Sequence, residues 1–368
     1  MSERSLFFAG GATGGHIYPA LAVAEQIRKL QPSTRIHFFC SNRRIDERIL
    51  GRTSFEYTKL PAVGLSARPW RLIGFADGFR KSCRLAEPVL AASSRPIAVG
   101  VGGYVAAPVC WAAHKLAVPV VLINVDLVPG RANRFVARFA ERIFVQFEET
   151  RPHFGRQGNK VTVVGCPLRE GFADPRPQDA IDRLKLDKNK KVLLVTGASS
   201  GADSINNTIC SLLPRLAAFA DDWQVVHLTG RTNLDKVKRF YEGAAITHRI
   251  LDYYDGMPQL LSASDLVVGR SGAVSVAEYA AAGVPSICMP YPHHRDMHQY
   301  RNAATLVEAG AAVIVEDLPD ETDRAERLWK ELQQLMRDDG RRRRMAGNCR
   351  SIARVDAARL VAEGLLGL

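Results

Sequence analysis

The sequence has no apolar run long enough to cross a bilayer, and its first residues, MSERSLFFAGG, lack the apolar core and cleavage site of a signal peptide. Its seven cysteines are scattered and form no CxxC pair, which favours reduced, buried thiols over disulfides. Acidic residues are the minority, 38 against 50 basic ones, so the formal net charge is +12. We therefore expect a cytosolic protein with an anionic partner, which could be nucleic acid, acidic lipid or a phosphorylated substrate.

Several signature motifs are also missing. The chain has no RNP, KH or helix-turn-helix signature, so the positive charge alone supports a nucleic-acid-binding protein only weakly. No Asp-x-Asp pair follows an expected strand, and we predict neither a metal nor another cofactor. What the chain does have is length and apolar content: 368 residues with 46% hydrophobic side chains predict a folded protein of two domains.

Short apolar segments alternate with helical patterns, which predicts parallel sheets covered by helices on both faces. In the first half the expected strands are Ser5–Gly10, Arg35–Cys40, Glu56–Leu60, Ile97–Gly100, Val118–Asn124 and Arg142–Val145. A polar, proline-bearing stretch between Gly165 and Lys191 predicts a linker to a second sheet. We expect domains over 1–165 and 166–349. By analogy with other two-domain proteins built on such parallel sheets, we expect a last helix near 350–368 that returns to the first domain.

The most informative stretch covers residues 270–302, RSGAVSVAEYAAAGVPSICMPYPHHRDMHQYRN. A strand that ends in small residues leads into an Ala-rich helix, and backbone N–H groups at such a helix start favour an anion such as a diphosphate. Glu278 follows one to two turns later and could accept hydrogen bonds from a ribose, while Gln299 and Asn302 offer amides to sugar hydroxyls. An ordinary βαβ crossover packed with small residues explains the pattern equally well.

The order Arg-Ser-Gly-Ala, Glu278, Ala-Ala-Ala-Gly, Pro290, Gln299 and Asn302 resembles the donor-binding motif of the MurG-type N-acetylglucosaminyltransferases, which complete lipid II. The resemblance covers nearly the whole chain and implies an α/β protein of GT-B architecture, with two Rossmann-like domains facing each other across a cleft. A loop at 197–202 resembles the family's phosphate loop, with Ser200 in place of a glutamine. The implied UDP-N-acetylglucosamine residues are Arg169, Ser199, Ser200, Gly201, Tyr254, Arg270, Ser271, Gly272, Ala273, Glu278, His298, Gln299 and Asn302.

A glycine-rich loop, GGATGGH at residues 10–16, precedes a helix expected over Pro19–Leu30. Its end resembles the acceptor-side loop of the same family, which implies that Thr13, Gly14 and Gly15 also bind UDP-N-acetylglucosamine and that His16 is a general base. Histidine titrates near neutral pH, which suits that role. A helix-start residue that only bonds to backbone is the alternative for His16.

Two further loops are expected at the same edge of the sheet. Gly103 and Tyr104 follow the strand Ile97–Gly100 and are assigned to the acceptor side. The loop before Pro129-Gly130 departs from the family, which usually has His-Glu-Gln-Asn where this chain has Ile-Asn-Val-Asp at 123–126. Asp126 thereby becomes a second candidate base, although it could simply cap the following turn.

A helix is expected over Arg68–Arg84, RPWRLIGFADGFRKSCR, with aromatic residues beside a basic rim. This composition is typical of a helix that rests on an anionic membrane surface, and the family's membrane patch falls at this place in the chain. The candidate membrane and acceptor residues are Trp70, Phe75, Phe79, Arg80 and Lys81. A core-facing helix with a solvated basic face is the alternative, and a solvated face is also what we expect of the run Arg341–Arg344.

The resemblance implies an inverting glycosyltransferase of peptidoglycan synthesis. It would move N-acetylglucosamine from UDP-N-acetylglucosamine to the 4-hydroxyl of a polyprenyl-diphosphate-linked muramoyl peptide. It would be peripheral, on the cytoplasmic face of the bacterial inner membrane, with no nucleic acid as partner. The alternatives are a glycolipid synthase or a UDP-sugar 2-epimerase of the same fold, or, from another class, a basic nucleic-acid-binding protein.

Overall fold

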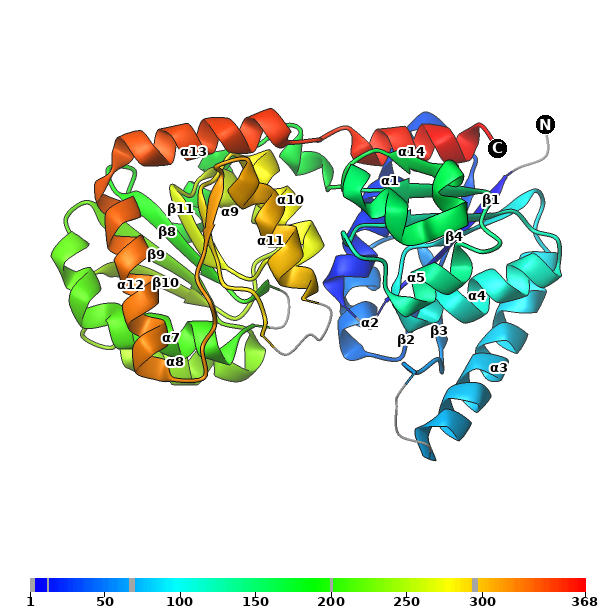
Figure 1. Ribbon diagram of the computed structural model, residues 1–368, viewed down its shortest axis with the longest axis horizontal. Helices are drawn as coiled ribbons and strands as arrows, with labels where there is room; N and C mark the ends of the chain where they lie inside the picture. The colour runs from blue at the N-terminus through cyan, green and yellow to red at the C-terminus, as the bar shows by residue number, and fades with distance from the viewer. Residues whose placement is uncertain (1–3, 12, 66–69, 199–200, 293–296) are drawn as a thin grey trace. The chain divides into compact units, whose positions relative to one another are not determined.

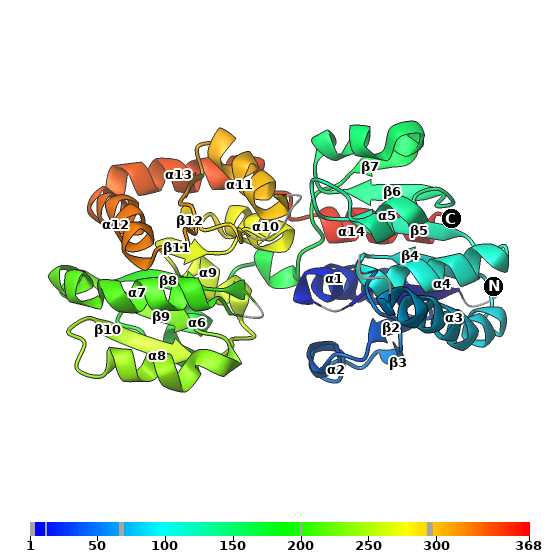
Figure 2. The ribbon, with the colours of Figure 1, turned by 60° about the horizontal axis from the view of Figure 1, so that its bottom comes forward.

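The computed structural model describes residues 4–11, 13–65, 70–198, 201–292 and 297–368 (Figure 1). The chain divides into two compact units, one of Met1–Arg169 with Val355–Leu368 and one of Glu170–Arg354. Each unit is built on one sheet of parallel strands with helices on both of its faces (Figure 2). The predicted fold class, α/β with two Rossmann-like domains, is confirmed.

The first unit has a seven-stranded sheet in the order β3-β2-β1-β4-β5-β6-β7. Its strands are β1 (Ser5–Ala9), β2 (Arg35–Ser41), β3 (Glu56–Leu60), β4 (Pro96–Gly100), β5 (Val120–Asn124), β6 (Arg142–Val145) and β7 (Val161–Val163). Its helices are α1 (Gly14–Leu30), α2 (Arg44–Leu50), α3 (Trp70–Ala91), α4 (Gly103–Lys115), α5 (Arg131–Val136), the 3-10 segment η1 (Glu148–Lys160) and α14 (Ala357–Leu366).

The second unit has a six-stranded sheet in the order β10-β9-β8-β11-β12-β13. Its strands are β8 (Lys191–Thr196), β9 (Trp223–Leu228), β10 (Thr247–Leu251), β11 (Leu266–Gly269), β12 (Ser286–Cys288) and β13 (Ala312–Ile314). Its helices are α6 (Pro177–Leu184), α7 (Asp203–Leu216), α8 (Leu234–Tyr241), α9 (Met257–Ser262), α10 (Ala273–Ala282), α11 (His298–Glu308), α12 (Glu321–Arg337) and α13 (Asp339–Ile352), with 3-10 turns η2 (Glu170–Phe172), η4 (Ala217–Phe219) and η5 (Arg231–Asn233).

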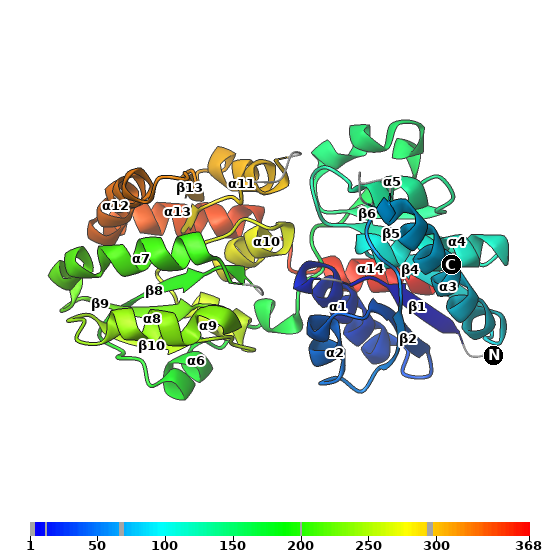
Figure 3. The same ribbon diagram turned by 90° about the horizontal axis from the view of Figure 1, so that it is seen from below.

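The central strands β1, β4, β5, β8 and β11 are buried along almost their whole length, because both faces of each sheet are covered there. In β8, Leu193 and Val195 belong to the core cluster that also contains residues of α7, α8 and α12, while Leu194 between them is equally buried. Since successive side chains of a strand point to opposite faces, Leu194 packs on the other side of the sheet. Figure 3 shows the second sheet with helices on either side.

Both sheets reverse their strand order once, between β1 and β4 in the first unit and between β8 and β11 in the second. At such a switch point, the loops that follow the two strands diverge to opposite faces and leave a crevice at the carboxyl edge. The functional loops expected from the sequence follow these same strands. The topology thus places one candidate site in each unit.

Several boundaries differ from the sequence prediction. Helix α1 begins at Gly14, so Pro19 lies inside it and removes one helical hydrogen bond, and His16 belongs to its first turn. Strand β10, for which the sequence predicts Arg249–Tyr254, covers Thr247–Leu251, so Tyr254 lies in the loop beyond the strand. The last helix is two helices, because the chain is extended at Ala353 between α13 and α14.

The C-terminal helix α14 belongs to the first unit, as expected, and packs against α1. The Arg4 guanidinium donates a hydrogen bond of 3.0 Å to the Leu365 carbonyl oxygen, which ties the helix end to β1. In α13, the expectation of a solvated basic face is wrong for Arg342. This arginine is buried over the Trp223 ring and donates to the Met336 carbonyl.

Candidate active site

In the first unit, three loops follow β1, β4 and β5 at the carboxyl edge of the sheet. The loop after β1 leads to His16 in the first turn of α1, and Gly102 and Gly103 lie directly after β4. Asp126 lies after β5. The structure therefore gathers the predicted acceptor-side residues at the switch point of one sheet.

The orientation of the His16 ring is defined by a hydrogen bond to the backbone. Its Nδ1 lies 3.0 Å from the carbonyl oxygen of Gly11 and 3.3 Å from Oγ1 of Thr13. Because a carbonyl oxygen can only accept, Nδ1 must carry the proton of the neutral ring, and the lone pair is on Nε2. None of the described residues hydrogen-bonds Nε2. The sequence left two alternatives for His16, a general base or a helix-start residue that bonds to backbone. The structure shows that one ring nitrogen makes the backbone bond while the other is available as a base.

Gly102 and Gly103 make room for this ring. A Cβ at Gly102 would lie 2.7 Å from Cδ2 and 3.0 Å from Nε2 of His16, and one at Gly103 would lie 2.8 Å from the Gly11 carbonyl oxygen. Both glycines also have positive φ, +120° and +72°, which other residues rarely adopt. The loop with Gly102 and Gly103 therefore limits where the ring of His16, the candidate base from the loop after β1, can lie.

The altered loop after β5 is organised by Asn124, which stands where the family usually has glutamate. Asn124 is fully buried, donates to the Asp126 carbonyl oxygen at 2.6 Å and accepts from the Asn133 side chain at 2.8 Å. Asp126 is half-buried, so its carboxylate is not shut inside the core. The amide of Asn124 acts on the shape of the loop, and Asp126 stays a candidate base.

The other predicted residues of this unit surround the same edge. Thr13 is exposed at the start of α1, whereas Gly14 is buried and Gly15 half-buried. Tyr104 is half-buried, with the Arg43 guanidinium 6.0 Å from its ring centroid. Arg169 lies over the ring of Tyr18, 4.6 Å from its centroid. Arg169 therefore belongs structurally to the first unit.

Helix α3 exposes other apolar side chains than the sequence predicts. Phe75 and Phe79 are only half-exposed, and Phe79 packs against the core of the first unit. Among the described residues of α3, the large apolar side chains that are exposed are instead Leu72, Ile73 and Leu85, with Ile73 78% exposed. Arg80 and Lys81 are exposed, with Lys81 paired to Asp77 at 2.8 Å. The side chain of Trp70 lies outside the described part of the structure.

In the second unit, the predicted donor residues lie around β8 and β11. Gly272 is the N-cap of α10, Ala273 its first residue, and Glu278 lies a turn and a half along the same helix with its side chain mostly buried. Ser271 is fully buried, and its hydroxyl donates to the Gln299 carbonyl oxygen at 2.8 Å. This hydrogen bond connects the loop after β11 with α11.

Helix α11 brings the remaining amides to this place. The side-chain oxygen of Gln299 accepts from the Tyr291 backbone N–H at 3.0 Å, which leaves its NH₂ group to donate elsewhere. Asn302, one turn on, is fully buried, and His298 is half-buried. Since α11 packs beside α10, the structure brings Gln299 and Asn302 to the helix that carries Glu278.

Two other loops complete this edge. Tyr254, after β10, is buried beside Arg183, whose guanidinium lies 5.1 Å from the ring centroid, and burial raises the pKa of its phenol. Gly201 packs against the end of β9, where an added Cβ would lie 2.5 Å from the Thr229 carbonyl oxygen. Ser199 and Ser200 lie outside the described residues.

Arg270 is held by groups that sequence reasoning missed. Its guanidinium contacts the Asp317 carboxylate at 2.8 Å, the Ser204 hydroxyl at 2.9 Å and the Met289 carbonyl oxygen at 2.8 Å. An acidic residue shortly after the apolar segment Ala312–Ile314 was the one available signal for Asp317. Among the described residues, no three His, Cys, Asp or Glu side chains gather as a metal site.

Comparison with known proteins supports the same picture over the whole chain. The family model of the glycosyltransferase family 28 N-terminal domain matches residues 6–145, and that of the C-terminal domain matches 192–360. The UDP-N-acetylglucosamine–N-acetylmuramyl-(pentapeptide) pyrophosphoryl-undecaprenol N-acetylglucosamine transferase of Lacticaseibacillus casei is 33% identical over 355 residues, which is 96% of this chain and 95% of that protein.

Two solved structures share the fold. The crystal structure of Acinetobacter baumannii MurG has a TM-score of 0.71 at 24% identity and covers 99% of this chain and 100% of that one. The UDP-GlcNAc 2-epimerase from Neisseria meningitidis, bound to UDP-GlcNAc, has a TM-score of 0.69 at 15% identity and covers 100% of both chains. The structural likeness to both enzymes shows the GT-B fold, and the sequence relationship decides between them. The chain belongs to glycosyltransferase family 28 and, within it, to the family of UDP-N-acetylglucosamine–N-acetylmuramyl-(pentapeptide) pyrophosphoryl-undecaprenol N-acetylglucosamine transferases.

Proposed function

We propose that this protein transfers N-acetylglucosamine from UDP-N-acetylglucosamine to the 4-hydroxyl of a polyprenyl-diphosphate-linked muramoyl peptide, with inversion at the anomeric carbon. Beyond family membership, the observation that carries the proposal is the His16 ring. Its Nδ1 is bonded to the Gly11 carbonyl, which leaves a basic Nε2 at the switch point of the first sheet. A general base in this position is what a hydroxyl nucleophile needs.

The reaction is a single displacement. Nε2 of His16 takes the proton of the acceptor hydroxyl while its oxygen forms a bond to the anomeric carbon of the donor sugar. The bond from that carbon to the diphosphate oxygen breaks at the same time, and UDP leaves with the electron pair. The proton ends on His16, so the base must be neutral before each turnover.

The donor is assigned to the second unit. The buried carboxylate of Glu278 holds the ribose hydroxyls, the start of α10 at Gly272 and Ala273 faces the diphosphate, and the NH₂ group of Gln299 donates to the sugar. The starts of the helices at this edge stabilise the leaving diphosphate without a metal.

Two replacements test the base. His16→Ala should lower turnover at saturating substrates by about 100-fold or more. UDP affinity should stay intact, because the ribose and diphosphate contacts proposed for Glu278, Gly272 and Ala273 lie in the other unit. Asp126→Asn should have a small effect. A loss confined to Asp126→Asn would move the role to that carboxylate, and small effects from both would mean that neither residue is the base.

The 2-epimerase alternative rests on the shared fold. It predicts conversion of UDP-N-acetylglucosamine when no acceptor is present. Incubation of the protein with this donor alone, followed by product analysis, should return unchanged donor. Product formation only after addition of a short-chain muramoyl-lipid acceptor is the expected result, and an epimerised nucleotide sugar would contradict the proposal.

We further propose that the protein is peripheral on the cytoplasmic face of the inner membrane and uses α3 for contact with anionic lipid. Leu72 and Ile73 are exposed beside Arg80, and Val63 and Leu65 are exposed in the segment before this helix. Exposed apolar side chains with a basic rim are the composition of an interfacial helix. None of the helices in the described ranges is long and apolar enough to span a bilayer.

Vesicle binding tests this surface. The protein should bind vesicles of anionic phospholipid, and added salt should weaken binding because each basic residue near such a surface contributes about 1 kcal/mol. Leu72→Ser with Ile73→Ser should reduce binding. Leu116→Ser, which removes an exposed leucine from the end of α4, is a matched control for lost apolar surface on another helix. Equal binding of neutral and anionic vesicles would contradict the proposal.

A further inference from the structure

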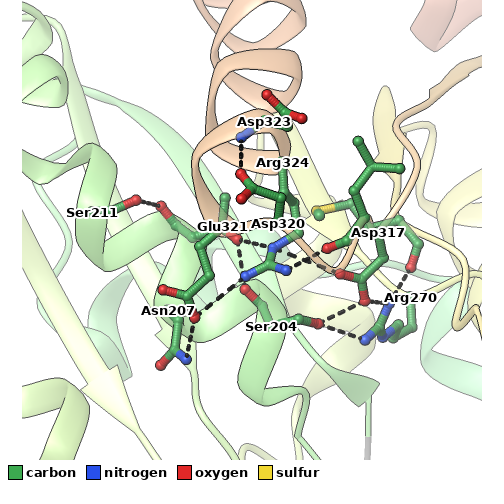
Figure 4. A network of polar contacts seen from close by, with 12 residues as sticks. Ser204, Asn207, Ser211, Arg270, Asp317, Asp320, Glu321, Asp323 and Arg324 are labelled. Carbon is green, nitrogen blue, oxygen red and sulfur yellow. Dashed lines mark hydrogen bonds and ion pairs between the residues drawn. The ribbon is translucent and has the colours of Figure 1, made fainter.

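Asp317 carries a buried charge that the expected donor site does not include. It lies after β13, is only 8% exposed, and its carboxylate accepts a hydrogen bond from the Ser204 hydroxyl at 2.7 Å and pairs with Arg270 at 2.8 Å (Figure 4). Arg270 in turn donates to Ser204 at 2.9 Å. Carboxylate, hydroxyl and guanidinium thus form a closed triangle of polar contacts.

This triangle joins elements that are distant in the sequence. Ser204 is in the first turn of α7, directly after the phosphate loop that follows β8. Arg270 immediately precedes Ser271 and Gly272 at the start of α10, and it also donates to Met289, the residue after β12. Asp317 therefore ties together the chain segments after β8, β11 and β12 from its own position after β13.

A second buried arginine supports Asp317 from behind. Arg324 on α12 is 4% exposed, lies 3.7 Å from the other carboxylate oxygen of Asp317 and donates to the Thr208 hydroxyl on α7 at 2.7 Å. Buried charges are tolerated when they are paired and hydrogen-bonded, and a carboxylate between two guanidinium groups meets this condition. Two positive charges and one negative charge leave the buried group of three positive overall.

The contacts of Asp317 also fix the positions of two helix starts. Helices α7 and α10 both start at the carboxyl edge of the sheet, on either side of the switch point between β8 and β11. Helix starts bind phosphate through backbone N–H groups, and this binding depends on where those groups point. Contacts that fix Ser204 and Arg270 relative to each other fix the two helix starts as well.

We propose that Asp317 is a positioning residue for the diphosphate of the donor. It acts through Arg270 and Ser204, which hold the starts of α7 and α10 at the spacing that a nucleoside diphosphate needs. The inference rests on the proposed function, because it takes the donor to be a UDP-sugar bound at this edge. Arg270 accordingly positions the diphosphate site from behind, because its guanidinium is bonded to Asp317, Ser204 and the Met289 carbonyl oxygen.

The test compares UDP with uridine, which lacks the diphosphate. Asp317→Asn keeps the shape of the side chain and removes its charge. We expect the ratio of UDP affinity to uridine affinity to fall by about 10-fold or more, since displacement by even 1 Å can be costly for such contacts. Uridine affinity itself should change by less than about twofold, because the diphosphate contacts are the ones displaced. Isothermal calorimetry, with uridine measured by competition, gives both values.

Two further variants separate positioning from other effects. Ser204→Ala removes two of the three contacts of the triangle without changing charge, keeps the ion pair of Arg270 with Asp317, and should lower the same ratio to a smaller extent. Glu316→Gln removes the neighbouring carboxylate, which is exposed and paired with Arg327 at 3.0 Å, and should leave the ratio unchanged. If Asp317→Asn does not fold, Ser204→Ala decides the question alone.

The outcomes are distinct. An unchanged or increased ratio in Asp317→Asn overturns the inference, even if the melting temperature falls, because a purely structural role destabilises the fold without selecting against the diphosphate. An increase is what charge alone would give, since loss of the Asp317 charge makes the buried group of Arg270, Asp317 and Arg324 more positive. Wild-type protein that binds UDP no better than uridine would overturn the proposed function together with this inference.

Discussion

The contact between Gly102 and His16 gives a sharp test of the catalytic assignment that leaves both titratable candidates in place. In Gly102→Ala the new Cβ would lie 2.7 Å from Cδ2 of His16. Carbon atoms pack best at about 3.5–4.0 Å, so the ring must move by about 1 Å or the loop must yield. Because a misplacement of about 1 Å can cost about 100-fold in rate, turnover should fall by roughly that factor.

The same substitution also costs stability. Alanine at φ +120° is strained by about 1–3 kcal/mol, and the overlap with His16 adds a comparable amount. The melting temperature of the first unit should therefore fall, and turnover must be measured where the variant is folded. UDP affinity should be unchanged, because the UDP contacts proposed for Glu278, Gly272 and Ala273 lie in the second unit.

Gly155→Ala is the matched control. Gly155 also has positive φ, +53°, but an added Cβ there would meet no atom within 4 Å. It therefore puts comparable strain on the backbone without the contact, and should lower stability by about 1–3 kcal/mol with turnover unchanged. Full activity of folded Gly102→Ala would refute the reasoning, since the ring would then be free to move without consequence.

Three further predictions concern other parts of the chain. Glu278→Ala should weaken UDP affinity by about 10-fold, from the loss of charge-assisted hydrogen bonds worth about 1.5–3 kcal/mol, and unchanged binding in calorimetry would remove Glu278 from the site. Burial lowers the pKa of His227 from 6.5 to about 3, so the unfolded chain binds a proton that the folded one does not. Stability should therefore decrease as pH falls from 6.5 toward 3, by up to about 1.4 kcal/mol per pH unit, and His227→Gln should flatten that part of a denaturant-derived stability profile. All seven cysteines are buried, and burial raises the pKa of Cys40, Cys110 and Cys288 to about 12, so a thiol reagent should modify the native protein far more slowly than the unfolded one.

The local pattern of the chain was sufficient for the fold class and for the places of the loops. Alternating apolar and helical segments require parallel strands, and parallel strands put the loops after β1, β4, β8 and β11 at carboxyl edges whatever the details of packing. The motifs with Glu278 and His16 could be recognised because their residues are close in sequence. Boundaries were less predictable, since Pro19 is tolerated inside α1 and the break between α13 and α14 has no strong breaker residue.

Tertiary structure decided what each of these residues can do. The proton position on His16 depends on a carbonyl of Gly11 and on the space left by Gly102, and neither is visible in a motif. Arg270 is tied to Asp317, 47 positions further along the chain, because strands β11 and β13 end at the same sheet edge. A sequence determines the order of chemical groups along the chain, whereas the hydrogen-bond partner of a buried group depends on which strand ends the sheet brings together, and that is fixed only when the sheet has formed.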